Sequence, residues 1–413
     1  MKLDGLDVAI AGAGVGGLAL GTMLARSGAR VTLYDQMEAP RPVGSGFVLQ
    51  PTGAQVLAAI GLLAPVAARG RRVDRMVGRL RDGGKPVLDV RYRSDEFGIA
   101  VQRVALFDVL FEAARAAGVT FETSARISGV EPGEHPRFVF VDGQRSTPAD
   151  LVIDTMGANS PIGNRPDSEL SYGALWATVP FPKGGVFQEN LLEQRYDRAS
   201  RMAGVLPVGT AREGAPAMAT FFWSLRTTDY AAWQTAGRNA WLEAVGRLWP
   251  EAVPLAAVAE PVHARYRHLT RQPVLGRHAL KIGDAWHATS PQLGQGANMA
   301  LLDAASLASA LIHAEDIGAA IGQHLRQRQM HVHSYQFLSH CLTPFYQSDS
   351  RLLPALRDHL IAPVTTLPGI RSIISTLVTG DLLDPVGRLR LPEAFARTCR
   401  RGEKHREDEG SAL

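Results

Sequence analysis

The feature that most constrains the fold is a strand–turn–helix–strand pattern near the N-terminus. Residues 7–12, DVAIAG, alternate small and branched apolar side chains as a buried strand does, and GAGVGG follows at 12–17. The helical pattern LALGTMLARSG at 18–28 ends at a glycine, and RVTLYD at 30–35 has the composition of a second strand. Two strands joined through one helix form a parallel pair, so this unit predicts an α/β fold built on a parallel sheet.

The glycines of this unit have a spacing typical of dinucleotide-binding turns, G-x-G-x-x-G. The first glycine permits a tight turn, the second lets a pyrophosphate approach the backbone, and the third allows the helix to pack closely on the strand. Asp35 ends the second strand, where an acid can accept hydrogen bonds from ribose hydroxyls. NAD and FAD both contain an ADP moiety, so this unit alone leaves the two open. The turn residues expected to contact the ligand are Gly12, Gly14, Val15, Gly16 and Gly17.

A second turn of this kind lies far along the chain, in the 283–298 segment, GDAWHATSPQLGQGAN. Its carboxylate, Asp284, follows the apolar run 279–282, and its last glycines precede a long helical pattern. The N–H groups at such a helix N-terminus are a ready site for negative charge. A chain that binds NAD through its first unit has no need of another ribose-and-phosphate site, so the second turn favours FAD.

Taken together, these motifs resemble the FAD-dependent monooxygenases of the aromatic-hydroxylase (para-hydroxybenzoate hydroxylase-like) family. The stretches GSGFVLQPTGAQVLAAIGLL at 44–63 and VQRVALFDVLFEAA at 101–114 carry the resemblance further, and it extends from about residue 6 to residue 330. It implies an α/β fold in which an FAD-binding Rossmann-like (glutathione-reductase-type) domain is interleaved with a mixed β-sheet substrate domain, with C-terminal helices added.

The resemblance also implies roles for individual residues. Asp284 is expected to hydrogen-bond the FAD ribityl chain, and Arg103 to reach the diphosphate. The backbone at Gly294, Gly296, Ala297 and Asn298 is expected to lie beside the flavin pyrimidine ring, where reduced flavin carries negative charge. His287 is expected to brace the turn and Asp303 to cap or pair locally. The residues expected to line the substrate pocket are Gln50, Trp223 and Pro291.

The implied function is a monooxygenase that hydroxylates or epoxidises a hydrophobic, aromatic or polycyclic small molecule through a flavin C4a-hydroperoxide formed with O₂. No acid–base residue is required by that chemistry, because the flavin carries the hard step. Two other enzymes of the same fold stay open, an FAD-dependent oxidase or reductase and a halogenase-like enzyme. The alternative from another class is a non-catalytic carrier of a prenylated or hydrophobic partner.

One element departs from the family pattern, in which D-G-x-x-S-x-x-R is usual. The stretch DTMGANSPIG at 154–163 keeps Gly157 and Ser160, but Met156 stands in the place of the acid and Gly163 in that of the arginine. In the family this element is tied to the FAD pyrophosphate and to productive use of NAD(P)H. NAD(P)H remains the expected electron donor, and these two residues predict that it reduces the flavin poorly.

The domain division follows from where these motifs and the strand patterns fall. The FAD-binding domain is expected from 1–75, 98–165 and 270–330, and the substrate-binding sheet from 76–97 and 166–269. A helical region, 331–395, and a charged tail, 396–413, predicted to be disordered, complete the chain.

Composition excludes several other classes of protein. With 44 basic and 40 acidic residues the net charge is +4, which is too mild to indicate nucleic-acid binding. Two cysteines, Cys341 and Cys399, form no disulfide framework, and the spacing of the histidines matches no metal site. No apolar run reaches the length of a membrane span, and the N-terminus lacks the apolar core of a signal peptide. We therefore expect a cytoplasmic monomer or homodimer whose partners are a small-molecule substrate and O₂.

Overall fold

The predicted strand–helix–strand unit is present in the computed structural model, which describes residues 3–39, 45–84, 86–93, 96–163, 169–182, 184–365 and 367–389. Strand β1 (Asp7–Ala11) pairs in parallel with β2 (Arg30–Tyr34), and helix α1 (Val15–Arg26) connects them. The glycine turn between β1 and α1 lies at the carboxyl end of β1, where the sequence places it.

The unit belongs to a six-stranded sheet with the order β18-β19-β11-β1-β2-β8. The pairs from β19 to β8 are parallel, and only β18 at the edge runs antiparallel. The strands added to β1 and β2 are β8 (Thr120–Glu122), β11 (Leu151–Asp154), β18 (Val274–Gly276) and β19 (Ala279–Lys281). Strands from the first 154 residues thus share one sheet with strands at 274–281, although about 120 residues separate the two stretches in sequence.

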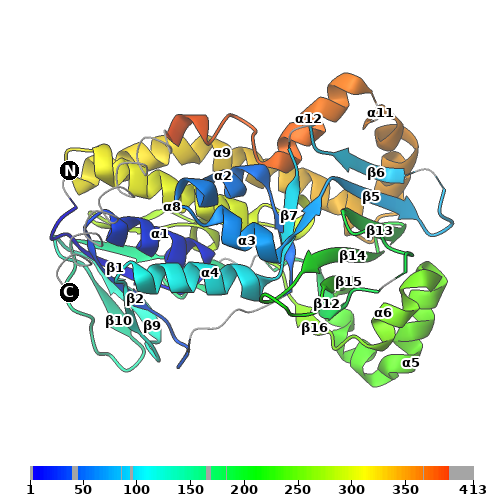
Figure 1. Ribbon diagram of the computed structural model, residues 1–413, viewed down its shortest axis with the longest axis horizontal. Helices are drawn as coiled ribbons and strands as arrows, with labels where there is room; N and C mark the ends of the chain where they lie inside the picture. Colours follow the sequence, from blue (N-terminus) through cyan, green and yellow to red (C-terminus); the bar gives the residue numbers. More distant parts are fainter. Residues whose placement is uncertain are drawn as a thin grey trace.

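Each face of this sheet is buried by a different layer. Ile10, Leu33 and Ile153 pack toward α1 and its neighbours in the main apolar core. Ala9 and Tyr34 point to the opposite face, where they pack against a hairpin (Figure 1). The helices of the first layer are α1, α2 (Pro51–Ala59), α3 (Leu63–Arg69), α4 (Arg103–Ala116), α8 (Gly296–His313) and α9 (Ile317–Tyr346), and the hairpin is β9 (Ile127–Glu131) with β10 (Arg137–Phe140).

A second, seven-stranded sheet has the order β16-β12-β15-β14-β13-β5-β6 and is antiparallel except for the β13–β5 pair. Its strands are β5 (Arg75–Leu80), β6 (Pro86–Arg91), β12 (Tyr172–Pro180), β13 (Leu191–Asp197), β14 (Arg201–Gly209), β15 (Met218–Arg226) and β16 (Val262–Ala264). Helices α5 (Tyr230–Leu248) and α6 (Val253–Ala257) bury one face of it (Figure 1). Between the large sheets lies a small one of β3 (Phe47–Leu49), β7 (Gly98–Val101) and β4 (Arg71–Val73).

Helices follow α9 as far as the structure describes the chain. They are α10 (Leu352–Leu356), the π-helix η5 (Arg357–Ile361), α11 (Ala362–Thr365) and α12 (Pro368–Thr379). The predicted charged tail, 396–413, lies outside the described residues. The architecture is the predicted α/β class: a parallel Rossmann-like sheet, a separate mixed sheet and C-terminal helices.

Candidate active site

The predicted cofactor residues meet at one edge of the parallel sheet. Five parallel strands end together there, at Ala11, Tyr34, Glu122, Asp154 and Lys281. The glycine turn, Asp35 and the start of the 283–298 segment all follow directly after these strand ends. In open α/β sheets, ligands bind in the crevice outside the carboxyl ends of the strands. The topology therefore brings the two ligand-binding turns predicted from distant parts of the sequence to the same edge.

Two of the glycines in the first turn are required by packing, and a third leaves its surface open. Gly12 has φ +101°, and a Cβ added there would lie 2.9 Å from the Thr155 carbonyl oxygen. A Cβ at Gly17 would lie 2.2 Å from the Gly12 carbonyl oxygen, so α1 could not approach β1 with any other residue. At Gly14 the nearest atom to an added Cβ is 4.0 Å away. This glycine thus leaves the backbone open to a ligand at the N-terminus of α1.

Backbone N–H groups on both sides hold the Asp35 carboxylate in place at the end of β2. Its carboxylate accepts hydrogen bonds from the backbone N–H of Ala13 (2.8 Å) and of Met37 (2.9 Å). A carboxylate has about four lone-pair directions, so two contacts leave capacity for ribose hydroxyls. A hollow of about 470 Å³ opens at this edge of the sheet, and its lining includes Tyr34 and Ser124 from the ends of β2 and β8.

Asp284 lies beside the N-terminus of α8. It begins the short helix α7 (Asp284–His287), and a Cβ on Gly296 would lie 3.7 Å from its Oδ1 atom. The residue is exposed to solvent. Burial raises the pKa of Asp284, while the charges of His287 and Arg103 act in the opposite direction. Arg103, the first residue of α4, thus lies near this carboxylate, with its guanidinium over the Phe47 ring.

The first turn of α8 is fixed through the side chain of Asn298. Its Oδ1 accepts the backbone N–H of Gln50 (2.9 Å), and its Nδ2 donates to the Gly294 carbonyl (3.2 Å). Gly294 has a left-handed conformation, φ +62°, which favours glycine. Asn298 is fully buried and its side chain is used internally, so the partly exposed backbone at 296 and 297 is the part of this helix start that can meet a ligand. Gln50 is buried and accepts the Tyr92 hydroxyl at 2.7 Å.

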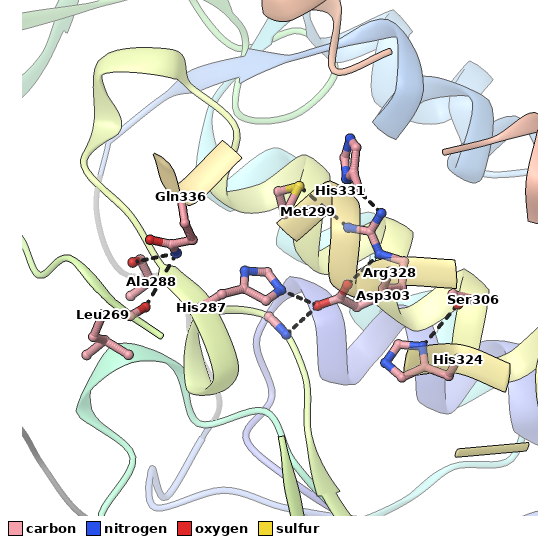
Figure 2. Close-up of polar contacts among 11 residues, drawn as sticks. Leu269, His287, Ala288, Met299, Asp303, Ser306, His324, Arg328, His331 and Gln336 are labelled. Carbon is pink, nitrogen blue, oxygen red and sulfur yellow. Dashed lines mark hydrogen bonds and ion pairs between the residues drawn. The ribbon is translucent and has the colours of Figure 1, made fainter. Parts of the chain in front are cut away.

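A buried ionic network that involves α8 and α9 braces the 283–298 segment (Figure 2). Asp303 of α8 accepts the backbone N–H of Gly283 (2.8 Å) and His287 Nε2 (2.6 Å) on one oxygen, and Arg328 Nε (2.7 Å) on the other. Burial alone would raise the pKa of Asp303, but the charges of His287 and Arg328 outweigh it and hold that pKa well below its usual range. His287 thus braces the turn as predicted, whereas Asp303 pairs with side chains distant in sequence and not locally as expected.

The network continues to the C-terminal end of α12. Arg328 Nη1 donates to His331 Nδ1 at 2.8 Å. The last carbonyls of a helix have no partner within it, and four consecutive ones in this region each accept a hydrogen bond from a side chain of another element. The pairs are Tyr335 Oη to Leu377 O (2.8 Å), Gln295 Nε2 to Val378 O (2.7 Å), Thr52 Oγ1 to Thr379 O (3.1 Å) and His331 Nε2 to Gly380 O (3.1 Å). The end of α12 therefore ties α2, α9 and the 283–298 segment together.

Of the three predicted pocket residues, Trp223 is placed elsewhere. Its side chain is buried between the seven-stranded sheet and α5, in an apolar cluster with Trp241 and Val245. Phe222 and Thr220 occupy the opposite face of the sheet, and Thr220 bonds the backbone N–H of Gly46 at 3.0 Å. This placement corrects the prediction, because the face that meets the FAD-binding sheet carries Phe222 instead. Pro291 is exposed, and Gln50 lies near Gly294.

Sequence reasoning missed two partly exposed aromatic residues, Trp176 of β12 and Tyr266. Tyr266 lies in the connection between β16 and β17 (Leu269–Thr270), and its hydroxyl accepts a hydrogen bond from Trp176 Nε1. Burial raises the pKa of Tyr266, and the charge of Arg103 lowers it, which places that cation nearby. Trp176 also packs on Phe222, with ring centroids 4.8 Å apart. The one available signal was the alternation of β12, which does not say which face is open.

The 154–163 stretch, which departs from the family pattern, is held by hydrogen bonds within it. Asp154 is buried and accepts Ser160 Oγ (2.5 Å) and the backbone N–H of Met156 (3.0 Å). Burial raises the pKa of Asp154, against the Ser160 hydrogen bond and the charges of Lys281 and Arg271. A Cβ on Gly163 would lie 3.0 Å from Lys281 Nζ. The turn at 155–163 is thus supported by one carboxylate, that of Asp154 at the end of β11, and the cation beside Gly163 is Lys281.

Neither a metal site nor a single membrane-spanning helix is found among the described residues. Within the part of the chain that the structure describes, no group of three or more His, Cys, Asp or Glu side chains is placed to hold a metal ion. Nor does any single described helix have the length and apolar character to cross a membrane, although the bent pair Leu352–Thr365 and Gly369–Thr379 passes that test by length and composition.

Comparison with known proteins identifies the family. The profile of the family described as "FAD binding domain" matches residues 5–325, which is most of the chain. The chain therefore belongs to this family, and its cofactor is FAD. Together with its relatives this makes it a flavoprotein monooxygenase of the para-hydroxybenzoate hydroxylase-like class, as the sequence motifs predicted.

Two curated relatives that the chain resembles are each 27% identical to it. The chain is 27% identical to aurachin C monooxygenase/isomerase of Stigmatella aurantiaca, covering 78% of this chain and 84% of that one. It is 27% identical to 6-hydroxynicotinate 3-monooxygenase of Bordetella bronchiseptica, over 73% and 81% of the two chains. Among solved structures, Klebsiella pneumoniae HpxO complexed with FAD and uric acid aligns with a TM-score of 0.75 at 20% identity, over 91% of this chain and 98% of that one. At that identity the structural likeness supports the fold alone.

Proposed function

We propose that this flavoprotein monooxygenase hydroxylates a planar, largely apolar aromatic molecule held between the seven-stranded sheet, on its Trp176 face, and the 283–298 segment. The observation that carries the proposal is the convergence of the glycine turn, Asp284, Arg103 and the α8 N-terminus at one sheet edge. FAD fits this arrangement, because Gly14 leaves the backbone open and the Asp284 carboxylate is exposed beside the α8 N-terminus.

We assign the parts of the cofactor as follows. Asp35 and the hollow after β2 and β8 hold the ribose and adenine, and the N-terminus of α1 meets the diphosphate. Asp284 meets the ribityl chain, with Arg103 supplying positive charge toward the diphosphate. The first-turn N–H groups of α8 face the flavin ring, where the positive end of the helix dipole favours the anionic reduced form.

The chemistry of oxygen transfer is supplied by the bound flavin, which in its reduced state activates O₂ and delivers one oxygen atom. The protein's own part is to exclude water and to orient the acceptor ring. Phe222 lies flat on the sheet, since a Cβ on Gly204 would meet its ring at 1.9 Å. Phe222 itself is buried, and the partly exposed Trp176 beside it offers, with Tyr266, an aromatic surface on which a planar substrate can stack.

The direct test measures the cofactor and the fate of oxygen together. Purified protein should be yellow and release FAD, not FMN, on heating. With a library of phenols, indoles, quinone precursors and polyketides under ¹⁸O₂, the product should carry one labelled oxygen. Hydrogen peroxide in equal amount to O₂ consumed, with no label in any product, would instead identify an oxidase. Flavin-free protein that cannot be reconstituted would revive the carrier.

The Asp284→Asn variant is expected to hold FAD more weakly. Loss of a charge-assisted hydrogen bond costs about 1.5–3 kcal/mol, or roughly a 10- to 150-fold rise in Kd. Fluorescence titration of apoprotein with FAD measures this change. Asp82→Asn serves as the control, because that carboxylate is exposed on the turn after β5, and its Kd should match that of the wild type. Equal Kd values for both variants would contradict the assignment of Asp284.

The electron donor is proposed to be NADPH or NADH, with slow reduction of FAD unless substrate is bound. Met156 is half-buried against an apolar cluster that includes Phe138, so the carboxylate usual at this turn is missing. Anaerobic stopped-flow bleaching of the flavin band, with and without substrate, measures the rate. Met156→Asp should accelerate reduction by NADPH, whereas Met156→Leu should not. Fast bleaching of the wild type by either nicotinamide alone would show that Met156 is harmless.

A further inference from the structure

A small enclosed cavity lies behind the 283–298 segment, on the side where α9 packs. Its volume, about 10 Å³, matches the space that one water molecule occupies. Residues Thr289 and Gln295 of the segment line it, as do Gln336 of α9 and His287. Figure 2 shows the imidazole of His287 between Asp303 on one side and Gln336 on the other.

Three polar atoms of the lining residues are buried and have no hydrogen-bond partner among the described residues. They are Thr289 Oγ1, Gln295 Oε1 and Gln336 Oε1. The orientation of each amide group is fixed by the hydrogen bond of its nitrogen. Gln336 Nε2 donates to Ala288 O at 3.0 Å, and Gln295 Nε2 donates to Val378 O at 2.7 Å. The two amide oxygens are therefore true acceptors, and not the result of reversed amides. Leaving such buried groups unpaired is costly, so a ligand that pairs them is favoured.

We propose that this cavity binds one structural water molecule. Water has two donors and two acceptor lone pairs, which matches the lining: the two glutamine oxygens accept its O–H groups, and the Thr289 hydroxyl donates to its oxygen. The cavity is too small for a larger molecule, and a buried water usually has two to four polar partners.

The water joins both ends of the turn at residues 290–294 to α9. Thr289 stands immediately before this turn and Gln295 immediately after it, whereas Gln336 belongs to a rigid helix. The water therefore fixes the turn that carries Pro291 and leads into the α8 N-terminus. This consequence rests on the proposed function, in which the opposite side of the turn meets the flavin, whereas the water site itself does not depend on bound FAD.

A matched pair of variants isolates the hydroxyl at position 289. Thr289→Val keeps the shape of the side chain and removes only the group that bonds the water, and Thr289→Ser keeps that group and removes a methyl. Crystal structures of the wild type, with and without FAD, should show a solvent peak within hydrogen-bond distance of Gln336 Oε1 and Thr289 Oγ1. The peak should be lost or displaced in Thr289→Val and retained in Thr289→Ser.

The same variants test the bracing role in solution. Thr289→Val should lower the Tm of the apoprotein and accelerate FAD release several-fold, with Thr289→Ser close to the wild type. If no water binds, removing an unpartnered buried hydroxyl should leave the Tm unchanged or raise it. Absence of the solvent peak in the wild type overturns the site. A peak accompanied by unchanged Tm and FAD release in Thr289→Val overturns the bracing role. The solvent peak and the Tm are measured on the apoprotein, so these two results do not depend on whether FAD binds as proposed, whereas the FAD release rate does.

Discussion

The Arg328→Ala variant is expected to lose about 3–5 kcal/mol of unfolding free energy, because it leaves a buried carboxylate without its cation. Both Arg328 and Asp303 have no exposed side-chain surface, and the Arg328 Nε to Asp303 Oδ1 distance is 2.7 Å. Arg328 also donates to His331 Nδ1, so the substitution removes two contacts of one network. The expected readout is a large fall in denaturation midpoint, measured by circular dichroism on apoprotein.

The matched control for this variant is an ion pair of equal length on the surface. Arg30 and Asp7 are also 2.7 Å apart, but their side chains are 65% and 47% exposed. Exposed pairs contribute about 0–1 kcal/mol, so Arg30→Ala should change the unfolding free energy little. Similar losses in the two variants would show that burial does not set the strength of the Arg328–Asp303 pair. FAD should be measured separately, because a ligand that binds only the folded state adds stability of its own.

Local patterns were sufficient to predict the two turns that are proposed to hold the cofactor. The glycine spacing at 12–17 carries its own geometric reasons, and the structure shows two of them as close contacts at Gly12 and Gly17. The 283–298 segment likewise has its acid, its turn and its helix start within a few residues. Such features can be predicted because the interactions that decide them lie within one short stretch of chain.

Interactions between distant elements could not be predicted in this way. Arg328 lies in the polar run RQRQMH, which has the composition of a solvated helix face, yet it is fully buried. Its burial is explained only by Asp303, which faces it from α8. The prediction that Trp223 lines the pocket was wrong for a related reason. The strand MATFFWSLR is apolar on both faces, so its alternation gives no sign of which face is open, and the sequence prediction chose the wrong one.

The last prediction is that the protein loses stability steeply as the pH falls from about 6.5 toward 4. Burial lowers the pKa of His324 from 6.5 to about 4 and that of His331 to about 3, with the charge of Arg328 acting in the same direction on both. The cause at His331 is visible in its contacts: Arg328 donates to Nδ1, and Nε2 donates to the Gly380 carbonyl. A proton on Nδ1 would therefore face an N–H group of the guanidinium.

The sign follows from proton binding in the two states. Above pH 6.5 both histidines are neutral in the folded and in the unfolded chain, and the full stability is present. Below it the unfolded chain binds two protons that the folded chain does not, so stability falls by up to about 2.7 kcal/mol per pH unit, about 1.4 for each proton. Near pH 4 the lowered pKa of Asp303 adds a loss of the same sign, since the unfolded carboxylate becomes protonated first.

Urea unfolding of the apoprotein, in steps of about half a pH unit from roughly pH 7.5 to 4, measures the slope of unfolding free energy against pH. His331→Gln keeps an acceptor for Arg328 and a donor for the Gly380 carbonyl but cannot titrate, so it should remove about half of the slope. His333→Gln changes an exposed histidine of the same helix and should keep the slope of the wild type. A wild-type curve that is flat down to pH 5, or a slope that His331→Gln leaves intact, would show that the buried histidines do not control acid stability.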